Sequence, residues 1–343
     1  MESLDQTGCL FKHESNPFPD IIQRQNMGDS LDTEILHDFS PLMIVYKDGR
    51  VERLEGEDVV PPEPDAETGV RCKDLEISSD PKVSVRIFLP KTANPGLKLP
   101  LLVYFHGGGF IVESAFSPTY QKHLCLVSAE ANTVIVSVDY RLAPEHPIPA
   151  AFDDSWLALK WVASHSSAGG GEEWLTEHAD FGRVFFGGDS AGGTIAHRMA
   201  IRVGLEGLDG INLDGLFLNC PFFWGKDPIG EEGDDMAPVR SYLESLWLFV
   251  NPTTTGPDDP LLNPTMDPEF RKLGCKKVLV YVAELDPLRQ RGWHYKEALG
   301  ENGWCGAAEL VEAKGEDHVF NVLSPTSDNS MAMVKKLAAF FNS

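Results

Sequence analysis

One serine of this sequence lies in a pattern that can make it a nucleophile. The pattern G-x-S-x-G spans residues 188–192, follows the short apolar run 184–186 and precedes a helical pattern with apolar residues on one face. Small residues around a serine at a sharp strand-to-helix turn let the two elements approach closely and leave the hydroxyl exposed. We therefore predict that Ser190 lies at the apex of such a turn. The alternative is a glycine-rich turn that only opens a helix, since Gly and Ser are common residues.

A second glycine-rich stretch could stabilise negative charge. The run His106-Gly107-Gly108-Gly109 directly follows the apolar stretch 101–105. Attack on an ester places negative charge on the carbonyl oxygen, and backbone N–H groups aimed at that oxygen lower the barrier. We expect the N–H groups of Gly107, Gly108 and Ala191 to be these donors. A flexible loop would not explain why two such motifs lie at two separate strand ends.

A serine hydroxyl becomes an effective nucleophile only when a base accepts its proton and a carboxylate orients that base. In this kind of site the order along the chain is serine, acid, histidine. Asp286 is our candidate acid because it follows the apolar run 278–282, and Glu284 is its nearest rival. His318 is the candidate base, since the other histidines precede the serine or lie in helical patterns.

The segments that must position these residues predict a parallel sheet. Five apolar runs lack the alternation of half-exposed strands, which is typical of strands buried on both faces. They span 101–105, 134–138, 184–186, 216–218 and 278–282. Helical patterns accompany them at 120–130, 153–164, 192–203 and 290–299. This order predicts an α/β fold, with a mostly parallel, doubly wound sheet and helices on both faces. In such sheets ligands bind at the carboxyl ends of the strands.

Two further patterns complete the expected fold. Residues 83–89 alternate strictly between polar and apolar, which predicts a half-exposed strand near a sheet edge. Residues 330–341 place apolar side chains on one helical face, which predicts a last helix that packs on the sheet.

The motifs together resemble a known family. Residues 106–110 (HGGGF), 138–146 (VDYRLAPEH) and 188–192 (GDSAG) are similar to the hormone-sensitive-lipase-like branch of the α/β-hydrolases, and most of all to plant carboxylesterases. Residues 45–54 and 220–225 resemble the subgroup that includes 2-hydroxyisoflavanone dehydratases. The resemblance runs from about Met27 to the C-terminus. It implies an α/β-hydrolase fold, the triad and oxyanion donors named above, no metal, and a cap over the site.

The resemblance also suggests how the chain is divided. We expect residues 1–38 to form a flexible arm whose later part contributes to the cap, and residues 39–343 to form the catalytic domain. The insertion 222–260, with its aromatic clusters, is expected to form the rest of the cap. Aromatic residues in such stripes belong more often to the hydrophobic core than to a pocket. Because pocket walls are mostly apolar, a pocket-lining role is the alternative. Our candidate pocket residues are Phe110, Phe222, Phe223, Trp224 and Val319.

Composition narrows the class of protein. Hydrophobic residues make up 42% of the 343 residues, enough for a large core, and the formal net charge of −23 disfavours nucleic acids and anionic membranes as partners. No stretch approaches the ~20 continuous apolar residues of a membrane span. The first thirty residues lack the apolar core of a signal peptide, so we expect a cytoplasmic protein.

The cysteines favour neither a metal site nor a disulfide framework. All six are scattered without C-x-x-C spacing, which argues against a zinc site, and a reducing compartment is the simplest inference. They are Cys9, Cys72, Cys125, Cys220, Cys275 and Cys305. No cofactor is expected.

These observations favour a serine carboxylesterase that cleaves small, largely apolar esters through an acyl-enzyme. One rival is a lyase like the 2-hydroxyisoflavanone dehydratases, which often carry threonine where Ser190 stands. Another is a non-catalytic binding protein like the plant gibberellin receptors, which resemble this family but lack the catalytic histidine. Ser190 and His318 favour the esterase. The expected partner is a small-molecule ester, and the sequence does not predict an oligomeric state.

Overall fold

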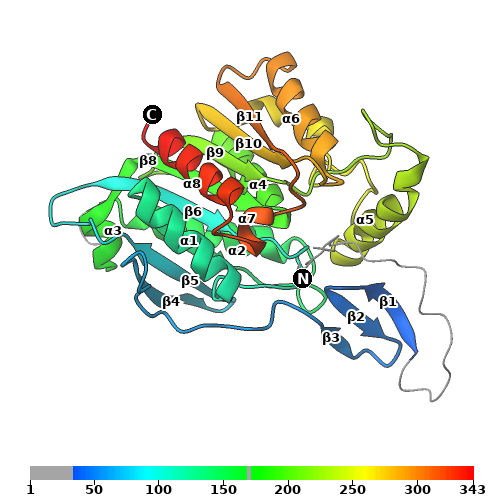
Figure 1. Ribbon diagram of the computed structural model, residues 1–343, viewed down its shortest axis with the longest axis horizontal. Helices are drawn as coiled ribbons and strands as arrows, with labels where there is room; N and C mark the ends of the chain where they lie inside the picture. Colours follow the sequence, from blue (N-terminus) through cyan, green and yellow to red (C-terminus); the bar gives the residue numbers. More distant parts are fainter. Residues whose placement is uncertain (1–33, 168–170) are drawn as a thin grey trace, which may run out of the picture.

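A computed structural model describes residues 34–167 and 171–343 and shows one large sheet flanked by helices (Figure 1). Its eight strands lie in the order β11-β10-β9-β8-β6-β7-β5-β4. Their bounds, in chain order, are β4 (Arg71–Ser79), β5 (Lys82–Leu89), β6 (Leu99–Phe105), β7 (Val134–Asp139), β8 (Ala179–Asp189), β9 (Leu213–Asn219), β10 (Lys277–Ala283) and β11 (Ala307–Ala313). The strands from β11 to β7 pair in parallel, whereas β5 and β4 pair antiparallel at one edge. The predicted mostly parallel α/β sheet is therefore confirmed.

Helices cover both faces of this sheet. Helices α1 (Pro118–Ala131) and α8 (Asp328–Phe341) pack on one face, and α2 (Ala150–Ser164), α4 (Ala191–Glu206) and α6 (Arg289–Glu301) pack on the other. Alternate side chains of the strands supply the two cores, since Val103 belongs to one buried cluster and Leu102 to the other. The shorter helical segments are α3 (Glu173–His178), α7 (Phe320–Leu323), η2 (Asp234–Met236), η3 (Pro264–Met266) and η4 (Phe270–Lys272).

The antiparallel edge is more buried than the sequence pattern suggested. Strand β5 is second from the edge, because β4, which the sequence did not predict, pairs along its outer side. Arg86 of β5 is fully buried, and its charge is accommodated by two hydrogen bonds to Asp74 of β4, at 2.7 and 2.8 Å. A paired guanidinium can be buried where an unpaired one could not. The pairing of β5 with β4, and of Arg86 with Asp74, explains how β5 can be buried although polar and apolar residues alternate in its sequence.

A separate three-stranded antiparallel sheet precedes the large one. Its strands are β1 (Ile35–Phe39), β2 (Met43–Tyr46) and β3 (Val51–Arg53). Residues 1–33 of the expected arm lie outside the described residues, whereas the last part of the arm forms β1.

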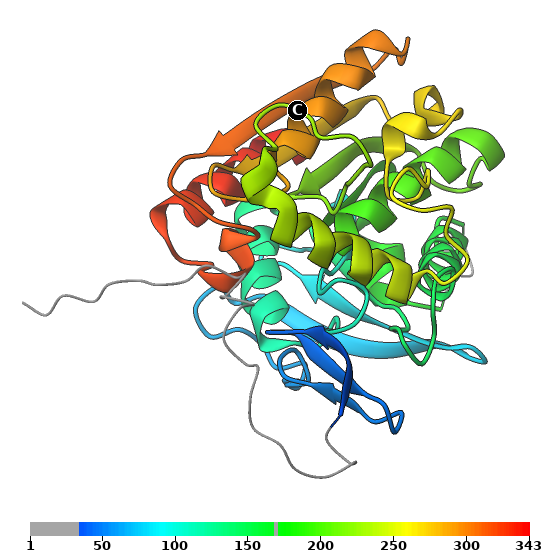
Figure 2. The ribbon, with the colours of Figure 1, turned by 90° about the vertical axis from the view of Figure 1, so that its right-hand side faces the viewer.

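This small sheet contacts the insertion 222–260, which is expected to form part of the cap. Helix α5 (Ala237–Val250) lies within residues 222–260. The rings of Phe39 and Phe249 are 5.0 Å apart, and Tyr242 donates a hydrogen bond to the Phe39 carbonyl at 3.3 Å. Figure 2 shows α5 crossing in front of the sheet with the small sheet beside it. Two segments far apart in the sequence therefore lie side by side.

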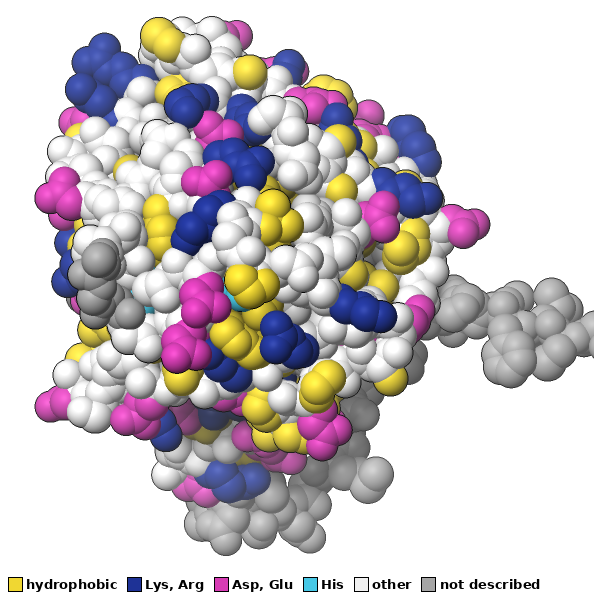
Figure 3. Space-filling model, turned by 90° about the vertical axis from the view of Figure 1, so that its left-hand side faces the viewer, with side chains coloured by type: hydrophobic (Ala, Val, Ile, Leu, Met, Phe, Trp, Pro, Cys, Tyr) yellow, Lys and Arg dark blue, Asp and Glu magenta, His cyan; other side chains and the backbone are white. Residues whose placement is uncertain are grey.

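The surface on the side away from α5 carries both signs of charge. Figure 3 shows Lys and Arg side chains interspersed with Asp and Glu on this face. Within residues 34–167 and 171–343, no helix is both long and apolar enough to cross a membrane.

Candidate active site

Ser190 lies at the predicted turn between β8 and α4. Its φ of 49° and ψ of −120° are strained for a residue with a side chain. The neighbouring glycines allow this turn, because a Cβ on Gly192 would lie 1.9 Å from the Phe105 carbonyl oxygen and one on Gly188 would lie 2.4 Å from Gly192. The strand and helix can approach only without side chains at these positions.

The Ser190 hydroxyl is the first member of a hydrogen-bonded chain. His318 Nε2 lies 3.0 Å from Ser190 Oγ, and His318 Nδ1 lies 2.9 Å from Asp286 Oδ2. The three residues follow the carboxyl ends of β8, β10 and β11, so the parallel sheet brings them to one edge. Asp286 also accepts the Leu288 N–H at 2.8 Å through its other oxygen, which fixes the carboxylate.

Glu284, the rival acid, has a different set of partners. Its carboxylate accepts the Gly315 N–H at 2.8 Å and pairs with Lys314 at 3.1 Å. It therefore braces the loop that carries His318 without contacting the imidazole. Asp286 is therefore hydrogen-bonded to His318, whereas Glu284 takes no part in the hydrogen-bonded chain of Ser190, His318 and Asp286.

The charges around His318 affect its basicity. Burial lowers the pKa of His318, but the nearby carboxylates of Asp286, Asp189 and Asp317, with the hydrogen bond to Asp286, raise it above its ordinary value overall. An imidazolium formed here is therefore stabilised by its surroundings.

The glycine loop, residues 107–113, follows β6 at the same edge of the sheet. Gly108 and Gly109 line the cavity beside Ser190, and both have positive φ, of 89° and 60°. Among the described residues, the N–H groups of Gly108 and Gly109 donate no hydrogen bond. The N–H of Ala191 donates none either. The N–H groups of Gly108 and Gly109 are thus available to a ligand in the cavity, and the N–H of Ala191 lies at the first residue of α4, directly after Ser190.

The prediction that the Gly107 N–H points into the cavity as a hydrogen-bond donor is wrong. Its N–H donates to the Tyr120 hydroxyl at 2.8 Å, and the residue does not line the cavity. Its role is steric, since a Cβ there would lie 2.4 Å from Asp189 Oδ2. The sequence reasoning missed Gly109 because the direction of each N–H depends on the fold of the loop.

Asp189 joins the two glycine-rich motifs below the cavity. It is 1% exposed, and its carboxylate accepts hydrogen bonds from the hydroxyls of Tyr104 at 2.7 Å and Tyr120 at 2.8 Å. Burial raises its pKa to about 6, although both hydrogen bonds act in the opposite direction. The sequence alone predicts no role for any of these three residues.

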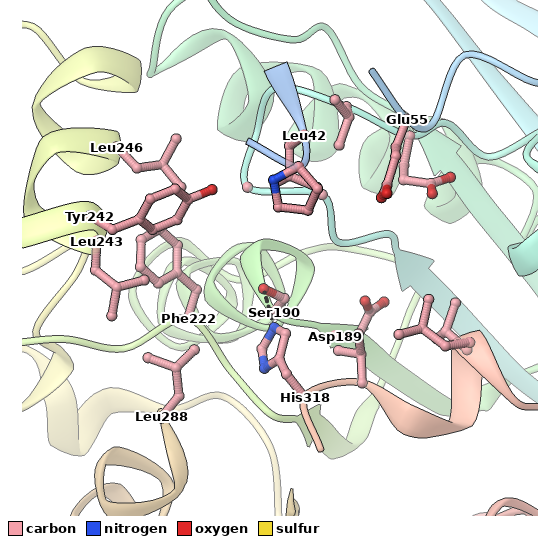
Figure 4. A pocket seen from close by; sticks show the side chains of 18 of the residues that line it. Leu42, Glu55, Asp189, Ser190, Phe222, Tyr242, Leu243, Leu246, Leu288 and His318 are labelled. Atoms are coloured by element: carbon pink, nitrogen blue, oxygen red, sulfur yellow. Dashed lines mark hydrogen bonds between the residues drawn. The ribbon is translucent and has the colours of Figure 1, made fainter. Parts of the chain in front are cut away.

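The cavity above Ser190 has a volume of about 170 Å³ and a largely apolar wall. Figure 4 shows Tyr242, Leu243 and Leu246 of α5 on one side of Ser190, with Glu55 on the other. Its apolar lining consists of Pro41, Leu42, Val112, Phe222, Leu243, Leu246, Leu288, Val319, Val322 and Leu323. Its acidic lining consists of Glu55, Glu113 and Asp189. The small sheet, α5 and the loops of the large sheet therefore all contribute to the lining of this cavity.

The predicted pocket residues divide into two groups. Phe222 and Val319 line the cavity. The prediction is wrong for Phe110, Phe223 and Trp224, which are buried elsewhere and do not line it.

Each of these three rings is held by neighbours behind the wall. Phe110 packs against Trp247 with centroids 6.4 Å apart, and Phe223 stacks on Tyr295 at 4.9 Å. Trp224 lies against the guanidinium of Arg291, at 4.7 Å. Successive residues of the segment point in different directions, so an aromatic run cannot line one wall.

One group of potential metal ligands occurs among the described residues. The ligand atoms of Cys220, Asp286 and His318 lie within 4.8 Å of one another. A metal ion would have to displace the hydrogen bond between His318 and Asp286. Burial, together with the charge of Asp286, raises the pKa of the Cys220 thiol well above its usual range, which keeps it protonated and a poor ligand. The cluster therefore fits proton transfer better than metal binding.

A strained turn that presents a hydrogen-bonded serine at the carboxyl edge of a parallel sheet defines a hydrolase-like site. Comparison with known families agrees: a sequence model described as alpha/beta hydrolase fold matches residues 102–322, and the chain belongs to this family.

Named relatives within the family include more than one activity. The chain is 46% identical over 324 residues to probable carboxylesterase 13 of Arabidopsis thaliana, covering 90% of this chain and 98% of that protein. It is also 46% identical over 320 residues to a 2-hydroxyisoflavanone dehydratase of Glycyrrhiza echinata, covering 90% and 96%. Among solved structures, an esterase of Pyrobaculum calidifontis is 29% identical with a TM-score of 0.64, covering 79% of this chain and 84% of that one.

Proposed function

We propose that this protein is a serine carboxylesterase that hydrolyses small, largely apolar esters through an acyl-enzyme. The observation that carries the proposal is the 3.0 Å contact between His318 Nε2 and Ser190 Oγ at the floor of an apolar cavity. The relatives named carboxylesterase, at 46% identity for the first of them, support the same reaction class.

In the first step Ser190 Oγ attacks the ester carbonyl carbon while His318 Nε2 accepts the hydroxyl proton. The electron pair of the carbonyl bond moves to oxygen, where the N–H groups of Gly108, Gly109 and Ala191 stabilise the charge. The intermediate then collapses, the bond to the alkoxide breaks, and the alkoxide takes the proton from His318. The products of this half-reaction are an alcohol and an ester of Ser190.

Water repeats the sequence in the second half-reaction. His318 accepts a proton from water as the oxygen attacks the acyl carbon, and it returns a proton to Ser190 Oγ as the acid leaves. Asp286 holds the imidazole in the tautomer with its proton on Nδ1 and stabilises the imidazolium that forms twice per turnover. The raised pKa of His318 is consistent with this role.

The walls of the cavity suggest the kind of ester. A volume of about 170 Å³ lined mainly by leucine, valine and phenylalanine suits a short acyl chain. We propose that the last part of the N-terminal arm, with the small sheet, and the insertion 222–260 together form the cap, because Leu42 and Leu246 line the cavity from these two segments. A cytoplasmic location stays a prediction, since a 42% identical tuliposide A-converting enzyme of Tulipa gesneriana is named chloroplastic.

Elimination of water is the second candidate function, because of the relative named 2-hydroxyisoflavanone dehydratase. His318 could remove a proton beside a carbonyl, and the same N–H groups could stabilise the enolate, without a bond to Ser190. An unbranched serine hydroxyl rotates and attacks more freely than the β-branched hydroxyl of threonine. Ser190 therefore favours hydrolysis, and the His318 that faces it argues against a purely binding role.

Labelling with a fluorophosphonate tests the proposal, because only an activated serine displaces fluoride from phosphorus. We expect the wild-type protein to be labelled at Ser190 and to hydrolyse a short p-nitrophenyl ester, and Ser190→Ala to do neither. Each protein is also assayed for dehydration of 2-hydroxyisoflavanone. Efficient dehydration that persists in Ser190→Ala, beside negligible ester turnover by the wild type, would identify a lyase instead.

A further inference from the structure

The guanidinium of Arg53 connects the small sheet to the glycine loop. Its Nε donates to the Ile111 carbonyl at 2.7 Å, and its Nη2 donates to the Ala143 carbonyl at 3.1 Å. Glu145 accepts two further hydrogen bonds, at 2.9 and 2.6 Å. Four hydrogen bonds to one planar group hold it in a single orientation. The Arg53 side chain is only 16% exposed, so water competes little with its contacts to the two carbonyls, whereas Glu145 is half exposed.

The glycine loop needs support from outside itself. Besides its glycines, Phe110 and Glu113 have positive φ, of 65° and 71°. Such backbone conformations cost residues with side chains about 1–3 kcal/mol each and persist only where the surroundings hold them. Within the loop, the N–H of Ile111 donates to the Gly108 carbonyl at 3.0 Å. A displacement of Ile111 would therefore be transmitted to Gly108.

Arg53 holds this loop at two points. One is the Ile111 carbonyl itself. The other is Ala143, whose N–H donates to the Phe110 carbonyl at 2.9 Å while its own carbonyl accepts from Arg53. The guanidinium thus locks the glycine loop onto the segment 143–145.

Arg53 also lies one residue from a backbone contact with the cavity wall formed by the small sheet. Arg53 is the last residue of β3, and the following residue, Leu54, donates its N–H to the Leu42 carbonyl at 2.8 Å. Leu42 lines the cavity opposite α5. Arg53 therefore connects the loop that carries the N–H donors, through its side chain, with the backbone of the small sheet beside Leu42.

We propose that Arg53 is a positioning residue for the oxyanion donors, acting through the Ile111 and Ala143 carbonyls to hold the N–H groups of Gly108 and Gly109. The inference rests on the proposed function, because these groups matter only if negative charge develops at the carbonyl oxygen. A misplacement of about 1 Å can cost about 100-fold in rate. Lysine cannot replace Arg53, because one ammonium group lacks the planar fork that reaches two carbonyls and a carboxylate together.

The test compares Arg53→Ala and Arg53→Lys with Arg183→Ala. Arg183 forms an ion pair with Asp180 at 2.9 Å near the start of β8, at the opposite end of that strand from Ser190. We expect kcat to fall about 100-fold in Arg53→Ala and about 10-fold or more in Arg53→Lys, with KM changed less than kcat. Arg183→Ala should stay within about twofold of the wild type. The folded fraction of each variant is measured by circular dichroism at the assay temperature.

Two further measurements separate positioning from a purely structural role. A trifluoromethyl ketone forms an oxyanion on Ser190, whereas the matching methyl ketone binds largely as the neutral ketone. In Arg53→Ala the affinity for the first should fall in parallel with kcat, while the affinity for the second stays near the wild-type value. Guanidinium chloride, at concentrations that leave the protein folded, should restore part of kcat in Arg53→Ala, and equal sodium chloride should not.

Folded Arg53→Ala with wild-type kcat would overturn the proposal. So would equal losses of affinity for both ketones, because the defect would then be in general binding. Failure of the proposed function looks different: the wild-type protein itself would neither turn over esters nor take up a fluorophosphonate.

Discussion

The Tyr120 hydroxyl donates a hydrogen bond to Asp189 at 2.8 Å, and the same oxygen accepts the Gly107 N–H at 2.8 Å. Tyr120 thus joins the glycine loop to the turn that carries Ser190. Tyr104 donates to the other oxygen of Asp189, and the Gly107 N–H donates to Tyr120 rather than to Tyr104. The two tyrosines therefore form a matched pair for experiment.

Tyr120→Phe should lower kcat/KM for a short p-nitrophenyl ester by about 10-fold, because both motifs lose a common anchor. Tyr104→Phe removes one donor from Asp189 and leaves Gly107 held, so its effect on kcat/KM should be clearly smaller. Both variants should lose about 1–3 kcal/mol of stability in urea unfolding, because each removes one donor from a buried carboxylate. Equal losses of kcat/KM in the two variants would mean that the contact with Gly107 does not matter for catalysis.

Asp286→Asn should leave a folded protein whose kcat is reduced by about 10⁴-fold, because the amide permits the wrong imidazole tautomer and cannot stabilise imidazolium. Glu284→Gln is the control, since Glu284 braces the Gly315 loop from a partly exposed position. It should lower kcat less than about 10-fold. A reversed order of the two effects would make Glu284 the functional acid.

Ester hydrolysis should be lost as the pH falls, because His318 must be neutral to accept the Ser190 proton. The nearby carboxylates raise the pKa of His318, so the loss should be half complete at a pH above the ordinary histidine value of about 6.5. Full activity is retained only above that midpoint. The measurement is kcat/KM between pH 5 and 9 under conditions where the protein stays folded.

Asp286→Asn offers an internal check on this assignment. The Asp286 charge and its hydrogen bond both raise the pKa of His318. The residual activity of the variant should therefore have its midpoint at a lower pH than that of the wild type. An unchanged midpoint would mean that a group other than His318 controls the profile.

Esters that carry a negative charge should be poor substrates. Glu55, Glu113 and Asp189 line the cavity, and among the described residues that line it there is no lysine or arginine. Burial, with the charges of Glu55 and Asp58, raises the pKa of Glu113, as expected of a carboxylate that no cation neutralises. A hemisuccinate ester should therefore have a kcat/KM at least about 10-fold below that of a neutral butyrate ester of the same alcohol.

Glu113→Gln tests the origin of this selectivity. Removing one negative charge should reduce the difference between the hemisuccinate and butyrate esters while changing butyrate turnover little. Equal turnover of both esters by the wild-type protein would show that the cavity charges do not reach the substrate.

The sequence by itself determined the features that depend on neighbours along the chain. The turn around Ser190 requires glycines within two residues of it, so its signature is local. Asp286 and His318 could be predicted because each follows an apolar run, and parallel strands bring their carboxyl ends to one edge. The same logic predicted the parallel pairing of the central strands and the helices α1, α2, α4, α6 and α8.

Only the tertiary structure decided which groups face the cavity. Gly107 and Gly108 are adjacent and alike in sequence, yet Tyr120 of α1 takes the N–H of one and leaves that of the other for a ligand. Phe222 and Phe223 are equally hydrophobic, and the packing of Tyr295 draws only the second away from the wall. The contacts of Arg53 join positions up to 92 residues apart. A local pattern carries no record of such partners, because the free energy of each contact depends on elements that meet only after folding.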